Sequence, residues 1–404
     1  MTHMARVSSL CAVLLSAACG GEGVVGDGPL TRDSLGITIV DNGALDPSRE
    51  LLARPEPVVE IGVADGPEAL QLFQVTGATR LHDGGFAVAN GGTRELRLYN
   101  EDGSHRATAG GAGDGPGEFG YPVAVHALDG DTVMVQDRLD RVFLTAHGEF
   151  LRRATTDRQA MAELMQRTGG NSEGGHWMPD GSLFAPVYHW DENPPVAGAP
   201  FRPSMTLVRV SGDFATVDTL GDFGGILQQY VDVGDERPSA TVPPFSRTTS
   251  WGLNASDGTV LAADNAVPRF ELFLPDGTHV IARWAETPGA VSGDEIEAWK
   301  DRQRNASWAQ RRLPQLERAW ATMDMPDEKP YFGRANTGSD GTVWLGPVEN
   351  GGTGWRAFAP DGRFLGVAGL PAGFFPMDSG PGWVLGVYRD DLEVEYLRLY
   401  PLVR

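Results

Sequence analysis

Cysteine is nearly absent from this chain of 404 residues, which has only Cys11 and Cys19. The chain after Cys19 therefore cannot form a disulfide or a thiolate metal site. The apolar stretch from Val7 to Ala18 is too short to span a bilayer. Positive charge is scarce, and the formal net charge of −21 argues against binding to nucleic acid and against electrostatic docking on anionic lipid. Solubility is the simplest reason for the acidic balance, and a cationic partner or divalent metal ions are the functional alternative.

The N-terminal segment reads as an export signal. An apolar core follows Arg6, and the sequence LSAACG at positions 15–20 resembles the lipobox of bacterial lipoproteins. Its leucine stands one place further from the cysteine than that pattern prefers. The resemblance implies that residues 1–19 are a signal peptide and that Cys19 carries the lipid. Gly20 after the cysteine implies the outer membrane, whereas an ordinary secretory signal would leave a periplasmic or secreted protein.

Turn sequences recur at a regular spacing through the rest of the chain. Asp-Gly pairs begin at positions 83, 129, 180, 257 and 340, and four of them are followed by a second X-Gly pair at 102, 147, 276 and 361. Asp-Gly between alternating apolar runs predicts a hairpin, because glycine accepts the positive φ that these turns need. Glycine-rich GGAGDGPGEFGY at 110–121, with a weaker copy at 62–73, joins consecutive units. This period predicts an all-β, six-bladed β-propeller over residues 57–404.

Two segments modify the predicted propeller. The last unit ends after its third strand, so we expect PVVEIGV at 57–63 to supply the fourth and to close the ring. Residues 20–56 are then a linker with an N-terminal strand. Residues 292–322 carry a helical pattern, which Pro314 divides into two helices, and we expect this pair to cap one face of the ring between the fourth and fifth blades.

Several units resemble the six-bladed propellers related to NHL repeats, which are often bacterial envelope lipoproteins. The segments that carry the resemblance are GGAGDGPGEFGYP, VMVQDRLDRVFLTAHGEFLR, PYFGRANTGSDGTVWL and VLGVYRDDLEVEYLRLY. The resemblance implies the fold and is nearly silent on function. Many members look like binding or scaffold proteins, and others of this architecture are metal-dependent lactonases or lyases.

Three predicted second strands end in a short polar side chain: Asn90, Asp137 and Asp264. An arginine follows each of them within five residues, at Arg94, Arg141 and Arg269. We favour a structural interpretation, in which the side chain caps the loop and the arginine pairs with it or with a neighbouring blade. The alternative is a ring of charged groups at the central channel, where His126, Asp137 and Asp264 are candidates to hold a divalent metal such as Ca²⁺.

The third unit concentrates aromatic and ionisable residues. His176, Trp177, His189 and Trp190 lie at strand ends, and Trp251 begins the matching strand of the fourth unit. Aromatic side chains with a few polar groups are typical of a ligand pocket, but they also pack propeller blades together, and we favour packing.

The sequence favours a non-catalytic, exported propeller that binds a protein, peptide or glycan on one face. We predict no cofactor and expect a monomer. No HxH or HExxH motif is present. The main alternative is a metal-dependent hydrolase or lyase with its site at the central channel, and a scaffold without a small ligand is a third hypothesis.

Overall fold

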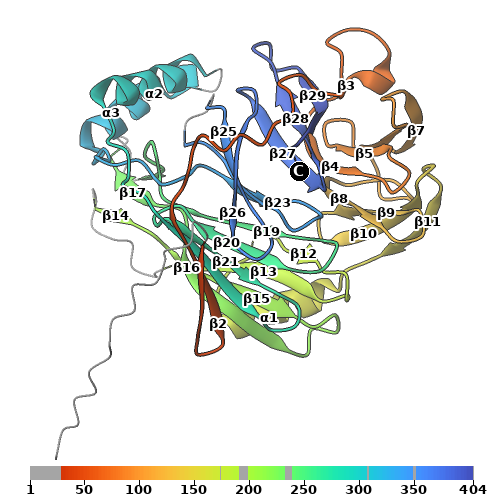
Figure 1. Ribbon diagram of the computed structural model, residues 1–404, viewed down its shortest axis with the longest axis horizontal. Coiled ribbons are helices and arrows are strands. Elements are labelled where there is room, and N and C mark those ends of the chain that lie inside the picture. Colours follow the sequence, from red (N-terminus) through yellow and green to blue (C-terminus); the bar gives the residue numbers. More distant parts are fainter. Residues whose placement is uncertain are drawn as a thin grey trace, which may run out of the picture.

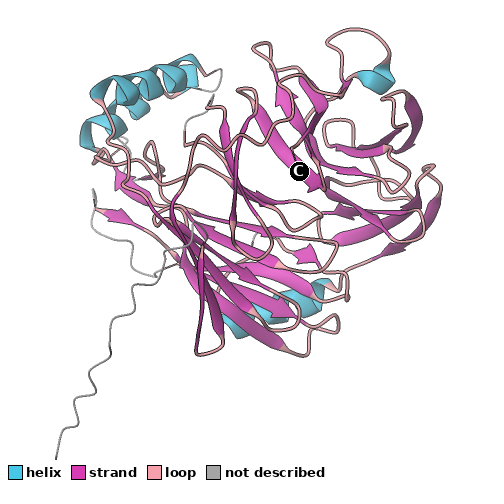
Figure 2. Cartoon of the chain, viewed as in Figure 1, coloured by secondary structure: helices cyan, strands magenta, loops and turns pink. Residues whose placement is uncertain are grey.

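The computed structural model describes residues 29–172, 174–190, 199–232, 239–306, 309–348 and 352–403. The predicted signal peptide and Cys19 lie outside these residues. Strands dominate the fold, and the helices lie at its periphery (Figure 1, Figure 2). None of the described helices is long and apolar enough to cross a bilayer.

The first two repeat units each form a four-stranded antiparallel sheet in which consecutive strands are neighbours. The first sheet contains β4 (Val75–Arg80), β5 (Phe86–Asn90), β6 (Glu95–Tyr99) and β7 (His105–Gly110). The second contains β8 (Pro122–Leu128), β9 (Thr132–Asp137), β10 (Asp140–Thr145) and β11 (Phe150–Ala154). The glycines of all nine predicted turns have positive φ, from +71° at Gly130 to +88° at Gly84. The predicted hairpins are therefore confirmed.

The third and fourth units keep this order with additions. The third sheet contains β12 (His176–Trp177), β13 (Leu183–His189), β15 (Ser204–Val210) and β16 (Val217–Gly224). The fourth contains β19 (Thr249–Leu253), β20 (Val260–Asp264), β21 (Arg269–Phe273) and β22 (His279–Ala285), and it is extended by β2 (Ile37–Ala44) and β1 (Leu30–Ser34). The strand expected near the N-terminus is thus found as β2, which pairs in parallel with β22. A small separate sheet is formed by β14 (Pro200–Phe201), β17 (Gln228–Val231) and β18 (Ser239–Thr241).

The last two units complete the sequence of sheets. One contains β23 (Ala335–Thr337), β24 (Val343–Leu345), β25 (Gly354–Phe358) and β26 (Phe364–Gly369). The other contains β27 (Phe374–Gly380), β28 (Trp383–Arg389), β29 (Glu395–Pro401) and β3 (Val59–Ile61). β3 pairs with β29, as expected for the segment at 57–63. Ile61 is buried there against Leu397 and Leu399 of β29.

The predicted helical insertion forms α2 (Gly293–Asn305) and α3 (Leu313–Thr322), with Pro314 in the first turn of α3. A capping box of Ser292 and Glu295 starts α2. The sequence reasoning missed α1 (Arg158–Thr168), which follows β11. Its local signals are an N-cap at Asp157, which accepts from two backbone N–H groups, and Gly169 in the left-handed conformation after the last turn. The short 3-10 helices η1 (Glu68–Leu70) and η2 (Ala309–Arg311) lie in connecting segments.

The first strand of each unit lies toward the centre of the molecule (Figure 1). β4 contacts β8 and β27, and β23 contacts β19 and β27. The second and third units are joined by a hydrogen bond of 2.6 Å from Gln136 Nε2 to the carbonyl oxygen of Gly175. Apolar side chains of neighbouring sheets form shared buried clusters, such as the one that Val88 of β5 shares with Leu385 of β28. The sheets are therefore arranged as the blades of a β-propeller.

Candidate functional site

A cavity of about 1220 Å³ lies where four of the first strands begin. Its wall includes Val75 at the start of β4, Thr248 before β19, Arg334 before β23 and Phe375 in β27. Helix α2 forms another part of the wall through four side chains: Glu295, Ala298, Trp299 and Arg302. The helical insertion thus forms part of the wall of this cavity. Cavities of this kind, between a rigid scaffold and an inserted element, are typical ligand sites.

Other groups cover the aromatic rings of the cavity. The Trp355 side chain is buried and meets the edge of Phe375 at 5.6 Å between ring centroids. The guanidinium carbon of Arg334 lies 5.7 Å from the centroid of Phe375, and the ammonium of Lys329 lies 5.7 Å from that of Phe245. Trp299 packs edge-on against Trp320 of α3. The cavity therefore offers few free aromatic faces.

The carboxylates of the cavity have partners within the protein. Glu395 is buried, and it accepts hydrogen bonds from the backbone N–H of Val75 at 2.8 Å and from Arg389 Nη2 at 2.5 Å. Arg389 also lies 3.5 Å from Glu393. Hydrogen bonds, first from Lys329 and then from Ser292, lower the pKa of Glu295 to about 2. These acidic groups are thus held by the protein itself.

Asp390, the remaining carboxylate of the cavity wall, accepts from the backbone N–H groups of Leu392 and Val394, each at 2.9 Å. It caps the turn between β28 and β29 in the same way as the Asx side chains of the blades.

Two arginines of the cavity differ from the carboxylates. Arg302 in the last turn of α2 and Arg334 before β23 are both exposed. Neither makes an ion pair in the part of the chain that the structure describes. Within the described chain, the Arg334 side chain interacts with the ring of Phe375. The cavity therefore carries two guanidinium groups that no carboxylate of the described chain neutralises.

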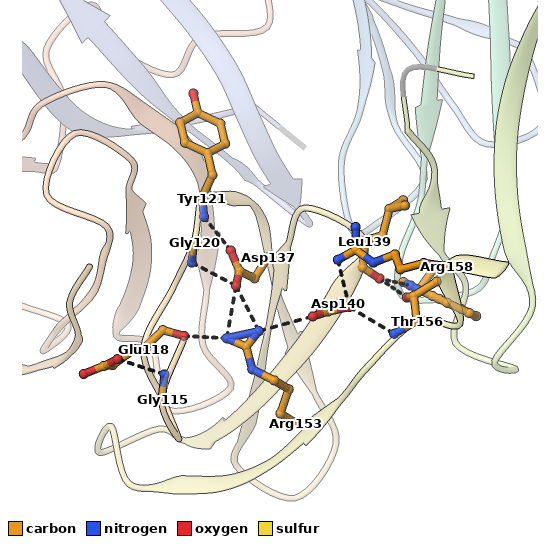
Figure 3. Close-up of polar contacts among 11 residues, drawn as sticks. Gly115, Glu118, Gly120, Tyr121, Asp137, Leu139, Asp140, Arg153, Thr156 and Arg158 are labelled. Carbon is orange, nitrogen blue, oxygen red and sulfur yellow. Dashed lines mark hydrogen bonds and ion pairs between the residues drawn. The ribbon is translucent and has the colours of Figure 1, made fainter. Parts of the chain in front are cut away.

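The structure supports the capping interpretation of Asn90, Asp137 and Asp264. The Asn90 side chain accepts from the backbone N–H of Phe73 at 2.7 Å. Asp137 accepts from the backbone N–H groups of Gly120 at 3.0 Å and Tyr121 at 2.6 Å (Figure 3). Asp264 accepts from the backbone N–H of its own loop. In each case the side chain holds the loop that enters or leaves a blade.

Asp137 and Asp264 pair with arginines other than the ones that follow them in the sequence. Asp137 pairs with Arg153 of β11, whose Nη1 and Nη2 lie 3.0 and 3.1 Å from Oδ2 (Figure 3). Asp264 is bound by both terminal nitrogens of Arg202, at 3.1 and 3.2 Å. Arg269 pairs with Glu271, and Arg94 is exposed with φ of +59°.

Strand register explains why Arg141 does not pair with Asp137. Arg141 lies opposite Gln136, the neighbour of Asp137, and therefore on the other face of the sheet. There it stacks on Trp177 of the next blade, with its guanidinium carbon 3.9 Å from the ring centroid. Arg153 lies opposite Val142, which lies opposite Val135 on the face of Asp137. The ion pair thus follows the alternation of the strands rather than the distance in sequence.

Two neighbouring histidines, His126 and His176, lie on the first strands of the second and third units. Burial lowers the pKa of His126 to about 4, with a smaller contribution from His176, and burial lowers the pKa of His176 to about 4. The Nε2 of His126 is buried and has no hydrogen-bond partner in the described structure. The ring of His176 packs edge-on against Trp251 at 5.2 Å. Both imidazoles are therefore neutral at pH 7.

The five aromatic and histidine candidates do not form one pocket. His176 and Trp251 contact each other, as described above. Trp177 is buried between blades and donates from Nε1 to the carbonyl oxygen of Leu139 at 2.7 Å. His189 lies 3.0 Å from Thr206 Oγ1, and Trp190 is exposed after β13. Packing accounts for Trp177, whereas Trp190 is open to solvent.

The candidates for metal binding do not fit a metal site. Within the described residues, no three side chains of His, Cys, Asp or Glu come together as ligands. Asp137 and Asp264 already have arginine partners, and Asp264 lines a separate cavity of about 310 Å³. The ionisable group that affects the pKa of His126 is His176, and neither Asp137 nor Asp264 contributes to that shift.

Sequence reasoning missed Arg302, Arg334 and Glu395, which line the large cavity. It also missed Asp378 of β27, a buried carboxylate that accepts from Thr79 at 2.9 Å and from the backbone N–H of Ser339 at 2.9 Å. Asp378 thereby joins the first, fifth and sixth units. One signal in the sequence could have indicated Asp378, since it is an aspartate within a mostly apolar strand. The unit of this strand has no Asp-Gly first turn.

No protein-family model matches the sequence, and no curated protein is similar to it. Solved structures do resemble the fold. A Bacteroides fragilis protein described as exported is 10% identical, with a TM-score of 0.46, over 91% of this chain and 100% of its own. The calcium-binding regucalcin of Agrobacterium tumefaciens is 12% identical, with a TM-score of 0.37, over 89% and 96%. A gluconolactonase of Xanthomonas campestris is 12% identical, with a TM-score of 0.38, over 87% and 100%. At these identities and TM-scores the likenesses assign no activity or ligand to this chain.

Proposed function

We propose that this protein is a binding module whose ligand enters the cavity beneath α2. The supporting observation is the cavity of about 1220 Å³ itself, walled by the starts of four first strands and by the inserted helix. The carboxylates of the cavity have partners within the protein, whereas Arg302 and Arg334 have no ion pair within the described chain and could bind an external partner. Its size suits an extended peptide or glycan segment rather than a small metabolite.

We further propose that the blades form a six-bladed ring, closed where β3 completes the last sheet. The pairing of β3 with β29 and the contacts of β27 with β4 and β23 support this arrangement. A closed ring would hold the cavity wall rigid, because the four first strands that begin there would be fixed relative to one another. It would act as a monomer.

A substitution that fills the cavity tests the binding proposal. Ala298 is exposed on α2 and lines the cavity, so Ala298→Trp should obstruct it without disturbing the core. Ala321 on α3 is exposed but does not line the cavity, and Ala321→Trp is the matched control. Full-length protein is applied to arrays of defined peptides and glycans. We expect the wild type and Ala321→Trp to bind the same ligands and Ala298→Trp to lose them. Binding that survives Ala298→Trp would place the ligand elsewhere.

We also propose that the protein is exported and anchored by lipid at Cys19, because the sequence LSAACG resembles a lipobox. Cys19→Ser should move the protein from the membrane fraction to the soluble fraction. A wild-type protein that is already soluble after export would contradict the anchor and leave the binding proposal intact.

A further inference from the structure

We propose that the ligand of the cavity is an acidic peptide segment whose carboxylates bind Arg302 and Arg334. This inference rests on the proposed function and specifies its ligand. It begins from charge. The chain has a formal net charge of −21, and yet Arg302 and Arg334 line a cavity without an ion pair to any residue that the structure describes. An anionic ligand would supply the missing charge.

The other charges of the cavity do not compete for such a ligand. Glu395 and Glu393 are both bound to Arg389, and Glu295 is bound to Lys329. Glu393 and Glu395 share the one cation of Arg389, and Asp390, the fourth carboxylate of the wall, accepts from backbone N–H groups. Within the described chain, Arg302 and Arg334 are consequently the arginines of the wall whose N–H groups no carboxylate occupies, and an anionic ligand can bind them.

The geometry of Arg334 favours a carboxylate. Its guanidinium lies over the ring of Phe375, with 5.7 Å between the guanidinium carbon and the ring centroid. This cation–π contact places the guanidinium beside the ring, and no hydrogen bond within the described chain occupies its N–H groups. Two parallel N–H groups of a guanidinium match the two oxygens of a carboxylate. Arg302, on the helix that covers the cavity, can bind a second carboxylate of the same ligand.

The remaining surface favours a peptide over a glycan. Sugar rings stack on free aromatic faces, but Phe375 and Phe245 are covered by cations and Trp355 is buried. The wall instead offers aliphatic side chains and prolines, among them Val75, Val242, Pro243 and Met377. These groups suit the apolar side chains of a peptide that alternate with its acidic ones.

Fluorescence anisotropy with labelled hexaglutamate tests the inference, and labelled hexaglutamine is the neutral probe. We expect full-length protein to bind hexaglutamate, more weakly as salt increases, and not to bind hexaglutamine. Arg302→Gln and Arg334→Gln should each weaken binding by about tenfold, and the double variant should abolish it. Arg152→Gln is the matched control. Arg152 is also exposed, lies over a phenylalanine ring, that of Phe143, and makes no ion pair in the described structure, but it does not line the cavity.

Several results would overturn the inference. Equal binding of hexaglutamine, or unchanged binding by the double variant, would show that these arginines do not select the ligand. Polygalacturonate that displaces hexaglutamate at a lower carboxylate concentration would identify an acidic glycan instead. Competition by millimolar inorganic phosphate alone would indicate a general anion site. If hexaglutamate does not bind while an array ligand is lost in Ala298→Trp, the cavity is the binding site and only the acidic-peptide inference fails.

Discussion

His126 lies on the first strand of the second blade, and Asp137 ends the second strand of the same blade. The protein gives Asp137 charged and polar partners but surrounds His126 with groups that disfavour its charged form. Two backbone N–H groups and the guanidinium of Arg153 surround the carboxylate of Asp137. His126 loses its charge because it is buried beside another histidine without an acidic partner. One region thus holds compensated charge, and the other excludes charge.

This difference separates residues that the sequence presents as one group. His126, Asp137 and Asp264 are the candidates for a metal site, yet the two carboxylates already have arginine partners. The strand-end carboxylates fix the loops between blades, and Asp264 does so with Arg202 as Asp137 does with Arg153. The strand-end side chains recur in three units and serve the blades, whereas Arg302 and Arg334 occur outside the repeat pattern and line the cavity.

The largest expected effect comes from breaking the compensated region. Arg153→Met should leave Asp137 buried without its cation and lower the free energy of unfolding by about 3–5 kcal/mol. Urea unfolding measures the loss. The neighbouring Arg152→Met, at an exposed site without an ion pair, should change stability by less than about 0.5 kcal/mol. Equal effects of the two substitutions would mean that the ion pair does not stabilise the blade.

A smaller effect, of about 2–3 kcal/mol per histidine, is expected from charging the channel. The pKa values of His126 and His176 in the folded protein, about 4, lie below the ordinary value of 6.5. As pH falls, the unfolded chain therefore binds protons first. The stabilisation is complete above pH 6.5 and is lost progressively as pH falls toward 4.

Unfolding measured between pH 7 and pH 4 checks this dependence with a matched pair of variants. His126→Leu should remove roughly half of the loss attributed to the two histidines. His147→Leu, at an exposed turn, should leave the pH dependence unchanged. A wild-type stability that is flat across this range would contradict the assignment of two neutral channel histidines.

The blades were predictable because their signals are local. Each Asp-Gly turn needs a glycine with positive φ, and the structure has one at each of the predicted positions. The insertion was predictable for the same reason, since Ser292 and Glu295 form a capping box and Pro314 begins the next helix. Helix α1 has similar local signals in Asp157 and Gly169, but it interrupts a repeat whose turns predict only strands.

The partners of charged residues were not predictable from spacing. Arg141 is close to Asp137 in sequence but lies on the opposite face of the sheet, and Arg202 reaches Asp264 across 62 positions. The cavity depends on contacts of the same kind, because Arg302 belongs to an inserted helix and Arg334 to the next blade. The sequence shows that these residues exist, but only the packing of blades and helix brings them into one wall.

The smallest expected effect tests whether the two regions are really separate. Asp137 and Asp264 are paired with arginines, and His126 and His176 are neutral and do not join these carboxylates. Millimolar Ca²⁺ should therefore change the free energy of unfolding by no more than about 0.4 kcal/mol. Metal analysis of the purified protein should likewise find no stoichiometric Ca²⁺ or Zn²⁺. Suppose instead that metal is bound and is lost in Asp137→Asn, Asp264→Asn and His126→Ala. The carboxylates would then have to release Arg153 and Arg202 to reach a common ion. In that case the strand ends and the channel would form one site, and a metal-dependent hydrolase would replace the binding module.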